Sequence, residues 1–481
     1  MAVEYPVVFE WDGEDDLDNE SALPGTAVEY MPQWYKQLGP LHEQKGMIPQ
    51  TTAKMCMPFS DAMTAGFIIP VPQDIKISVF DGEVSVEEGE EVVTVYGTQE
   101  SVEDAGSDNC QYTPPEIKID NDWKIKTPPS YSSLICKPIN RKIPELTPNA
   151  MFVDTDQYDG RLPIPAVLDG QTIELNKGDP LAHVLPLRRE ELISRCKCYS
   201  FSEAPDMKDG YDEISSRLDT QPDFYRQELW VKKPTGSVVR SDGENIFDGV
   251  SGSDIQGILD QTLDIEIVDN SDEPDVLVQE YAVHDQFKDI FPEVYRASQS
   301  LPPWTQDFES VVDQYGEEEE HIEEWARRAS SLGFKVPLNS SVTVSQTHDG
   351  DIDYESGDPS PLHPMGIDKI GKMFPLFQYN IVNVHNKYVS RTPEGYSTLY
   401  ISPLNHMQKY YRSFSGIVEQ YLYRGGSNAP GVLHTLDERF ELEQGTPITQ
   451  HISFKHESML TNGVIVDGRE DGDLKENFGG N

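Results

Sequence analysis

The chain has 481 residues, with 84 acidic side chains against 38 basic ones and a formal net charge of −46 at pH 7. This excess of acid argues against a sequence-independent nucleic-acid binder, which needs Lys and Arg to neutralise phosphates, and against docking on anionic lipid. Because so many carboxylates repel one another unless salt screens them, the charge indicates a protein made for salty surroundings, marine or halophilic. An ordinary acidic cytosolic protein is the alternative.

No segment approaches the 18 or more consecutive apolar residues of a membrane span, and the start of the chain lacks the basic region of a signal peptide. Five cysteines make an odd and thinly scattered set, which does not predict a disulfide framework. Cys196 and Cys198 have no second Cys or His pair at zinc-like spacing, so we expect incidental thiols there.

The predicted elements are mostly strands. Residues 74–79 alternate apolar and polar side chains, which is the period of a half-buried strand. Residues 84–96 are expected to turn at their glycine like a hairpin. Two short apolar runs in 162–175 flank Asp169-Gly170, a strong signal for a second hairpin.

One helix is predicted over residues 317–334, with acidic side chains in its first turn and Gly333 where a C-terminal cap belongs. Apolar residues share one face of this helix, and Glu324 and Arg328 are placed to support it as a pair four residues apart. The stretch 203–270 mixes short helical patterns with Gly, Ser and Asp linkers, and the sequence does not predict how it folds.

The chain repeats itself at long range. Residues 123–144 match residues 388–409, which lie 265 positions later, and residues 178–190 face residues 445–457 after a two-residue slip. Agreement in order at a nearly constant offset predicts a tandem duplication rather than chance similarity. The retained pairs include Tyr131-Ser132 with Tyr396-Ser397, Pro138 with Pro403, Asn140 with Asn405, and Gly160 with Gly425.

Three motifs of the first copy carry a resemblance to a known group. They read Pro-Ser-Tyr at 129–131, Val-Asp-Thr-Asp-Gln-Tyr-Asp-Gly at 153–160, and Gly-Asp-Pro-Leu-Ala-His at 178–183. In this order they resemble the dUTPase and dCTP-deaminase group, which is built on the β-clip fold. The chain is also similar to an uncharacterised group of tailed-phage proteins, through Pro-Gln-Trp-Tyr-Lys at 32–36 and Cys-Met-Pro-Phe-Ser-Asp at 56–61.

The resemblance to nucleotide pyrophosphatases implies a catalytic set of Asp154, Asp156 and Tyr158. Asp154 would activate water as a general base with Mg²⁺ as cofactor, and Tyr158 would lie beneath the sugar and base. The phosphate clamp departs from the pattern, because residues 137–141 replace the expected Arg-Ser-Gly motif. His183 also stands where the group has glutamine.

The second copy departs further, because Glu419 and Tyr421 replace Asp154 and Asp156. The residues that both copies retain are mainly those that shape turns and strands. We therefore favour a non-enzymatic interpretation, without a cofactor; if the protein is an enzyme, the resemblance implies a dUTP-type nucleotide hydrolase.

A calcium site is the weak metal candidate. Asp349, Asp351 and Asp353 stand at positions 1, 3 and 5 of an EF-hand-like loop. Position 6 is Tyr354 rather than glycine, and position 12 is Ser360 rather than glutamate, so a solvated acidic loop is the stronger interpretation.

The predicted fold is mainly β, with two tandem β-clip or β-barrel-like domains of dUTPase type, short helices and a connector that contains α-helix. The first domain, with an N-terminal arm, is expected over 1–205 and the connector over 206–274. The second domain is expected over 275–460, and an acidic flexible tail over 461–481.

The sequence favours one function over two alternatives. The leading hypothesis is a virion structural protein of a tailed virus from a marine or halophilic host, such as a capsid decoration or cement protein or another head or tail component. It would be made in the host cytoplasm and would bind other virion proteins and copies of itself; the resemblance implies a trimer, and no nucleic acid or membrane is expected as a partner. The alternatives are a nucleotide pyrophosphatase that uses Asp154 and Mg²⁺, and an acidic binding protein that acts on a host partner.

Overall fold

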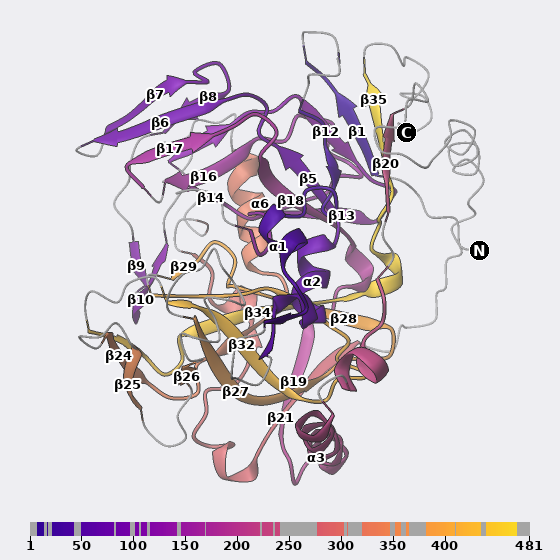
Figure 1. The fold of residues 1–481 in the computed structure, drawn as a ribbon, viewed down its shortest axis with the longest axis vertical. Helices are drawn as coiled ribbons and strands as arrows, with labels where there is room; N and C mark the ends of the chain where they lie inside the picture. The colour runs from indigo at the N-terminus through magenta and orange to yellow at the C-terminus, as the bar shows by residue number, and fades with distance from the viewer. Residues whose placement is uncertain are drawn as a thin grey trace.

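The computed structural model describes residues 7–13, 17, 22–42, 50–80, 83–96, 102–104, 107–112, 116–141, 146–168, 170–221, 224–233, 236–240, 277–302, 305, 320–346, 352–356, 362–364, 381–408, 410–433 and 439–468. We call residues up to 204 the N-terminal half, residues 205–240 the connector and residues from 277 the C-terminal half. In Figure 1 the N-terminal half fills most of the upper part and the C-terminal half most of the lower part.

The described chain is mainly β, with few helices (Figure 1). Two five-stranded sheets form its centre, one in each half, and their strands follow one another in the same spatial order. The first is β15 (Met151–Val153), β13 (Tyr131–Cys136), β18 (Pro180–Arg188), β5 (Phe67–Pro70) and β2 (Gly25–Thr26). The second is β31 (Gly416–Val418), β28 (Tyr396–Ile401), β34 (Pro447–Lys455), β23 (Phe334–Pro337) and β22 (Tyr295–Arg296).

The middle strand of each central sheet is buried along nearly its whole length, in β18 as in β34. A strand covered on both faces selects side chains without a polar, solvent-facing alternation. This explains why neither strand shows a regular apolar–polar alternation; β18 is mostly apolar, whereas β34 also buries polar side chains such as Thr449, Gln450 and His451.

Smaller three-stranded sheets flank the centre, and here both predicted hairpins are wrong. β6 (Ile75–Phe80) lies between β7 (Glu83–Glu88) and β17 (Thr172–Leu175), whereas β8 (Val93–Val95) joins a different sheet beside β11 (Ile117–Ile119). β16 (Ile164–Leu168) pairs with β11 and β14 (Leu146–Pro148), not with β17. The segments around Gly89 and Gly170 therefore connect strands of two different sheets instead of two paired strands.

The second half has a matching small sheet of β33 (Phe440–Leu442), β24 (Val342–Gln346) and β25 (Ile352–Ser356). Its other long strands are β27 (Ile381–Arg391), β32 (Gly426–Leu433) and β30 (Tyr411–Ser413). Shorter pieces are β3 (Leu41–His42), β4 (Gln50–Thr51), β9 (Val102–Asp104), β10 (Ser107–Tyr112), β26 (Leu362–Pro364) and β29 (Met407–Gln408).

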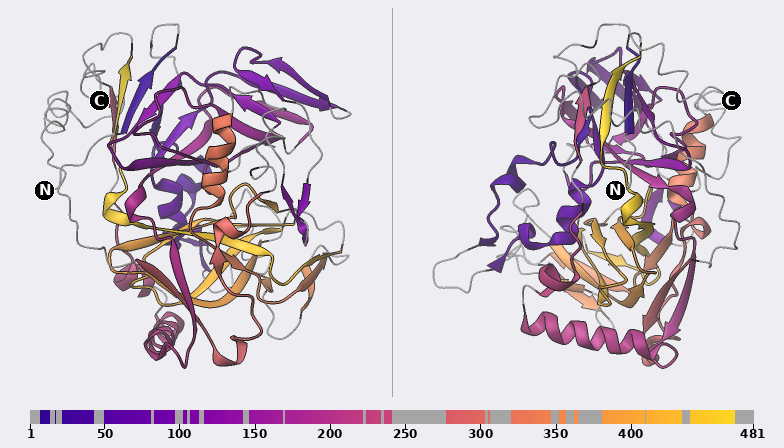
Figure 2. Two further views of the ribbon diagram at one scale, coloured as in Figure 1. Left: turned by 180° about the vertical axis from the view of Figure 1, so that it is seen from behind. Right: turned by 90° about the vertical axis from the view of Figure 1, so that its right-hand side faces the viewer.

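The two halves exchange strands. β1 (Val7–Trp11), at the start of the chain, pairs in parallel with β35 (Gly463–Asp467) from the end of the described chain, and β12 (Trp123–Lys126) flanks β1. β21 (Val278–Val283), at the start of the C-terminal half, pairs in parallel with β19 (Arg195–Ser200) from the end of the N-terminal half. The segment expected to be a tail thus begins with a buried strand, which crosses into the other half (Figure 2).

Helices are exchanged in the same way. α2 (Met57–Thr64) packs on β31 of the C-terminal half, and α6 (Glu320–Ser330) packs on β15 of the N-terminal half. A hydrophobic cluster accordingly draws on both halves, with Leu134, Phe152 and Leu185 beside Leu399, Ile452 and Phe454. The two halves therefore pack against each other through shared hydrophobic clusters.

Besides several 3-10 helices of three residues each, the other helices of the described chain are the short α1 (Gln33–Gln37) and, in the connector, α3 (Pro205–Thr220). The π-helix η3 (Tyr225–Leu229) and the strand β20 (Val238–Arg240) follow α3. α3 lies along the end of the C-terminal half (Figure 2). Among the described residues, no helix is both long and apolar enough to cross a membrane.

Candidate functional site

Asp154, the predicted base, follows β15 directly and lies against α6 of the other half. Arg328 of α6 donates from both terminal nitrogens, at 2.6 Å to Asp154 Oδ1 and 3.0 Å to Oδ2. Arg189, just after β18, lies 3.2 Å from Oδ1, and the hydroxyl of Ser132 also donates to that oxygen. Both carboxylate oxygens are therefore occupied by donors of the chain itself.

Asp156 shares this network. Its carboxylate receives two parallel hydrogen bonds from Arg189, at 2.8 Å and 2.6 Å, and a third from the backbone N–H of Ser130 at 2.8 Å. A fork-on-fork pair of this kind fixes the geometry of both partners. The structure thus brings Asp154 and Asp156 together, around two arginines that the sequence analysis did not select.

The ring of Tyr158 points to α6. It stacks edge-on against Trp325, with ring centroids 4.8 Å apart, and lies 6.1 Å from His321. Its hydroxyl donates to the backbone carbonyl of Arg161 at 3.1 Å, and burial raises its pKa. The face that the resemblance assigns to a nucleoside is covered by a helix of the C-terminal half.

The electrostatics of Asp154 suit an ion pair rather than a base. Burial alone would raise its pKa, but hydrogen bonds from Arg328 and Ser132 and the charges of Arg328 and Arg189 hold the pKa below its ordinary value. A carboxylate stabilised in its ionised form abstracts protons poorly, because proton transfer weakens as the pKa falls away from the working pH.

A pH prediction follows for Asp154→Asn. Because the folded pKa is lowered, the ionised carboxylate stabilises the fold above its unfolded pKa, and this stabilisation is lost as the pH falls through the folded value. We expect the variant to unfold at lower urea than the parent at pH 7, and the gap to shrink below about pH 4. Urea unfolding at several pH values measures this; an equal gap at pH 7 and pH 3 would contradict it.

A different arrangement occupies the corresponding place of the C-terminal half. Glu419 follows β31 directly, is fully buried, and accepts a 3.2 Å hydrogen bond from Ser397. Instead of arginine, its cation is Lys233 of the connector, whose Nζ contacts Oε1. The helix packed on β31 is α2, and it contains Asp61, which accepts a 2.8 Å hydrogen bond from the indole N–H of Trp230.

His183 makes one hydrogen bond as an acceptor and one as a donor, as a glutamine side chain could. Its Nδ1 accepts from the backbone N–H of Ile139 at 3.2 Å, so Nε2 carries the proton and donates to the carbonyl of Ala65. In the other half Gln450 accepts from the N–H of Leu404 at 2.9 Å and donates to the carbonyl of Leu332 at 2.6 Å. The departure from glutamine at 183 therefore preserves the same pair of bonds.

This equivalence predicts that His183→Gln is tolerated. Burial, with help from the charge of Arg141, lowers the pKa of His183 to about 3. Between that value and its unfolded pKa of about 6.5 only the unfolded chain is protonated, so stability falls as the pH falls. We expect His183→Gln to match the parent at pH 7 and to lose less stability at pH 4. His183→Ala, which leaves two backbone groups unpaired, should be less stable at both; denaturant midpoints measure all three.

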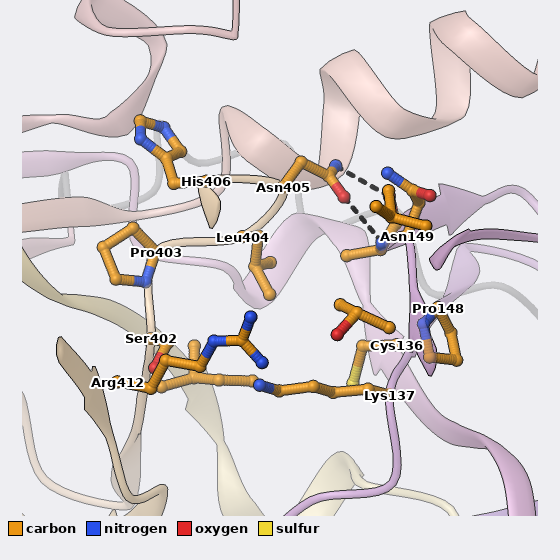
Figure 3. Close-up of a pocket in the computed structure, with 14 residues that line it drawn as sticks. Cys136, Lys137, Pro148, Asn149, Ser402, Pro403, Leu404, Asn405, His406 and Arg412 are labelled. Carbon is orange, nitrogen blue, oxygen red and sulfur yellow. Dashed lines mark hydrogen bonds between the residues drawn. The ribbon is translucent and has the colours of Figure 1, made fainter. Parts of the chain in front are cut away.

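A small cavity of about 50 Å³ lies between described residues of the two halves. It is lined by the turns after β13 and β28 and by β14 and β30; the side chains of Lys137 and Arg412 and the loop of Asn405 surround it (Figure 3). Asn405, in the left-handed conformation with φ 60°, accepts from the N–H of Ala150 at 2.7 Å and donates to its carbonyl at 2.9 Å. Asn140, with φ 55°, makes the same two bonds with Ser415.

The other predicted site residues are not brought together. Asp349 and Asp351 lie outside the described residues, and Asp353 is an exposed residue of β25. Burial raises the pKa of Cys196 and Cys198 to about 11 and about 12, as expected of thiols packed against a hydrophobic cluster. Within the described ranges, no group of three His, Cys, Asp or Glu side chains is placed to hold a metal ion.

No family model and no curated protein matches the chain. Among solved structures, the chain is similar to the 2′-deoxycytidine 5′-triphosphate deaminase of Agrobacterium tumefaciens. The two are 8% identical over 81% of this chain and 86% of that one, with a TM-score of 0.24.

Proposed function

We propose that the protein is a non-enzymatic structural component of the virion of a tailed virus from a marine or halophilic host, such as a capsid decoration or cement protein or another head or tail part. The observation that carries this proposal is the exchange of β35 and β19, which makes each half complete the other. A chain whose two halves pair strands with each other suits a structural role under mechanical load. The excess of acidic side chains suits direct exposure to salty water.

We further propose that the halves are tandem copies of one dUTPase-like β module. The matching order of the two central sheets supports this, as do residues that play the same part in both halves, such as Asn140 and Asn405. A threefold assembly of such chains would present six modules. Sedimentation equilibrium tests it: a mass of three chains is expected, and a monomer at all concentrations would contradict it.

The environment of Asp154 supports a non-enzymatic role, because Arg328 and Arg189 occupy the carboxylate that would have to activate water. With Mg²⁺ and dUTP or dCTP we expect no release of pyrophosphate above background. Turnover that disappears in Asp154→Asn would overturn this part of the proposal and favour the nucleotide pyrophosphatase.

The virion assignment is tested on purified particles of the virus that encodes the chain. Quantitative peptide mass spectrometry should find the protein in constant proportion to the major capsid protein after gradient purification. Its loss during purification would sink the virion assignment, and its recovery on a host protein instead would favour the acidic binding protein.

A further inference from the structure

A lysine and a glutamate are buried in contact where the connector crosses the C-terminal half. The side chain of Lys233 is 8% exposed and that of Glu419 is 0% exposed, and Lys233 Nζ touches Glu419 Oε1. The second carboxylate oxygen, Oε2, is buried and has no hydrogen-bond partner among the described residues. A buried oxygen left without a donor is costly, so the contact is not a fully satisfied salt bridge.

A second carboxyl group belongs to the same cluster. Asp61 of α2 is 6% exposed, interacts electrostatically with Lys233 and is held by the indole N–H of Trp230 at 2.8 Å. Burial raises its pKa to about 6, against the hydrogen bond from Trp230 and the charge of Lys233. Asp61 can therefore be protonated near neutral pH and can both give and take a proton.

Apolar side chains close in sequence to both partners pack together. Phe224 and Leu229 of the connector are buried in one cluster, against which Leu422 and Tyr423 pack from the residues just after Glu419. Separated charges are expensive in such surroundings, so burial works against the ammonium and the carboxylate alike. Burial also lowers the pKa of Lys233 to about 8. A proton passed from Lys233 to Glu419 would give a neutral amine beside a neutral carboxylic acid.

We propose that Lys233 and Glu419 condense to form an isopeptide bond, with Asp61 as the group that transfers the proton. The lone pair of Nζ attacks Cδ of the protonated Glu419 carboxyl, and a C–N bond forms. Asp61 takes a proton from the nitrogen and delivers it to the departing hydroxyl, so a C–O bond breaks and one water leaves. Asp61 ends in its starting state, and the reaction consumes no oxidant or other reagent.

The N-terminal half provides the comparison. There the carboxylate after the strand, Asp154, faces Arg328, and a guanidinium does not lose its proton in proteins. The Asp154 and Arg328 side chains are also 30% and 26% exposed, so water solvates both charges. That pair stays ionic, whereas the pair in the C-terminal half combines a lysine, deep burial and a third carboxyl group.

The bond would tie the connector covalently to the C-terminal half. It would close a loop from residue 233 to residue 419, so the chain could not open fully even when denatured. The bond requires only Lys233, Glu419 and Asp61, whatever particle or complex the protein belongs to.

Mass spectrometry of the full-length protein tests the proposal. The intact mass should be lower than the sequence mass by one water, about 18 Da. After denaturation and trypsin digestion, residues 233–240 and 413–424 should be recovered as one branched peptide, joined through Lys233 and Glu419. Recovery of these peptides only as separate, unmodified species from folded protein kept for a day at 37 °C would overturn the proposal.

Three variants make the test specific. Lys233→Arg keeps the charge and Asp61→Asn keeps the hydrogen bond to Trp230, and both should show the full sequence mass while circular dichroism confirms that they fold. Arg328→Lys is the matched control, since it places a lysine beside Asp154 in the other half. It should lose only the one water at Lys233; a second water lost there would contradict the need for a buried third carboxyl group, and a branched peptide in Asp61→Asn would remove Asp61 from the reaction.

Discussion

Deletion of residues 461–481 is expected to abolish folding of the whole chain. The deletion removes β35, which lies between β1 and β20 and places Val464, Ile465 and Val466 in the interior at 1–4% exposure. Three buried apolar side chains contribute roughly 5–9 kcal/mol between them, comparable to the net stability of a domain. Loss of soluble protein, or of the cooperative thermal transition, measures the effect.

A shorter deletion is the control for this prediction. Removing residues 469–481 leaves β35 intact, and the melting temperature should change by only a few degrees. If the chain without 461–481 melted as cooperatively and at the same temperature as the parent, the exchanged strand would not be part of the shared core.

Gly333→Ala is expected to be the most damaging single substitution in the C-terminal half. Gly333 has φ +64°, and a Cβ at this position would lie 2.0 Å from the carbonyl oxygen of His451 in the central strand β34. The left-handed conformation alone costs alanine about 1–2 kcal/mol, and the backbone clash adds to it, so we expect a loss of about 3 kcal/mol or more. Gly66→Ala should behave in the same way, because its Cβ would lie 2.2 Å from the carbonyl oxygen of Val184.

Gly445→Ala separates the cost of the left-handed backbone conformation from the cost of the steric clash. Gly445 has φ +92°, but a Cβ there meets nothing within 4 Å, so the substitution carries the conformational cost without the clash. Denaturant unfolding should give a loss of about 1 kcal/mol for Gly445→Ala. Equal losses for Gly333→Ala and Gly445→Ala would contradict the close approach of Gly333 to β34.

The sequence predicts the mainly β class and the long helix, because these rest on local periodicity. Residues 74–79 form a strand with Ile75 and Ile77 buried, and the helix predicted over 317–334 is described as α6 over Glu320–Ser330. The sequence identifies Asn405 only as a residue that both copies retain. In the structure Asn405 has the left-handed conformation, and its side chain accepts a hydrogen bond from Ala150 of the other half.

Pairing between distant segments could not be predicted in this way. Periodicity identifies a strand but not its partner, which is why the two hairpins were wrong and why the parallel pairing of β1 with β35 was not foreseen. The same limit applies to the site. Arg328 was expected to pair with Glu324 on its own helix, but it turns to Asp154, 174 residues away in the chain.

Buried ionic clusters escape sequence analysis for a related reason. Lys233 lies in a stretch with no predicted fold, and Asp61 lies 172 residues before it, so no spacing rule connects them. A signal existed only in the comparison of copies, where Asp61 stands opposite Arg328 and Glu419 opposite Asp154. The replacement of Asp61 by Arg328 reverses the charge at this matched position, which indicates that the ionic clusters of the two halves differ.

The central claim, that this interlocked chain is a structural part of a virion, is tested most directly by a density map of the purified particle. We predict density at a defined, repeated position of the head or tail into which both halves fit as one unit, with β35 crossing between them. A complete map in which every protein density is assigned to other chains would contradict the claim.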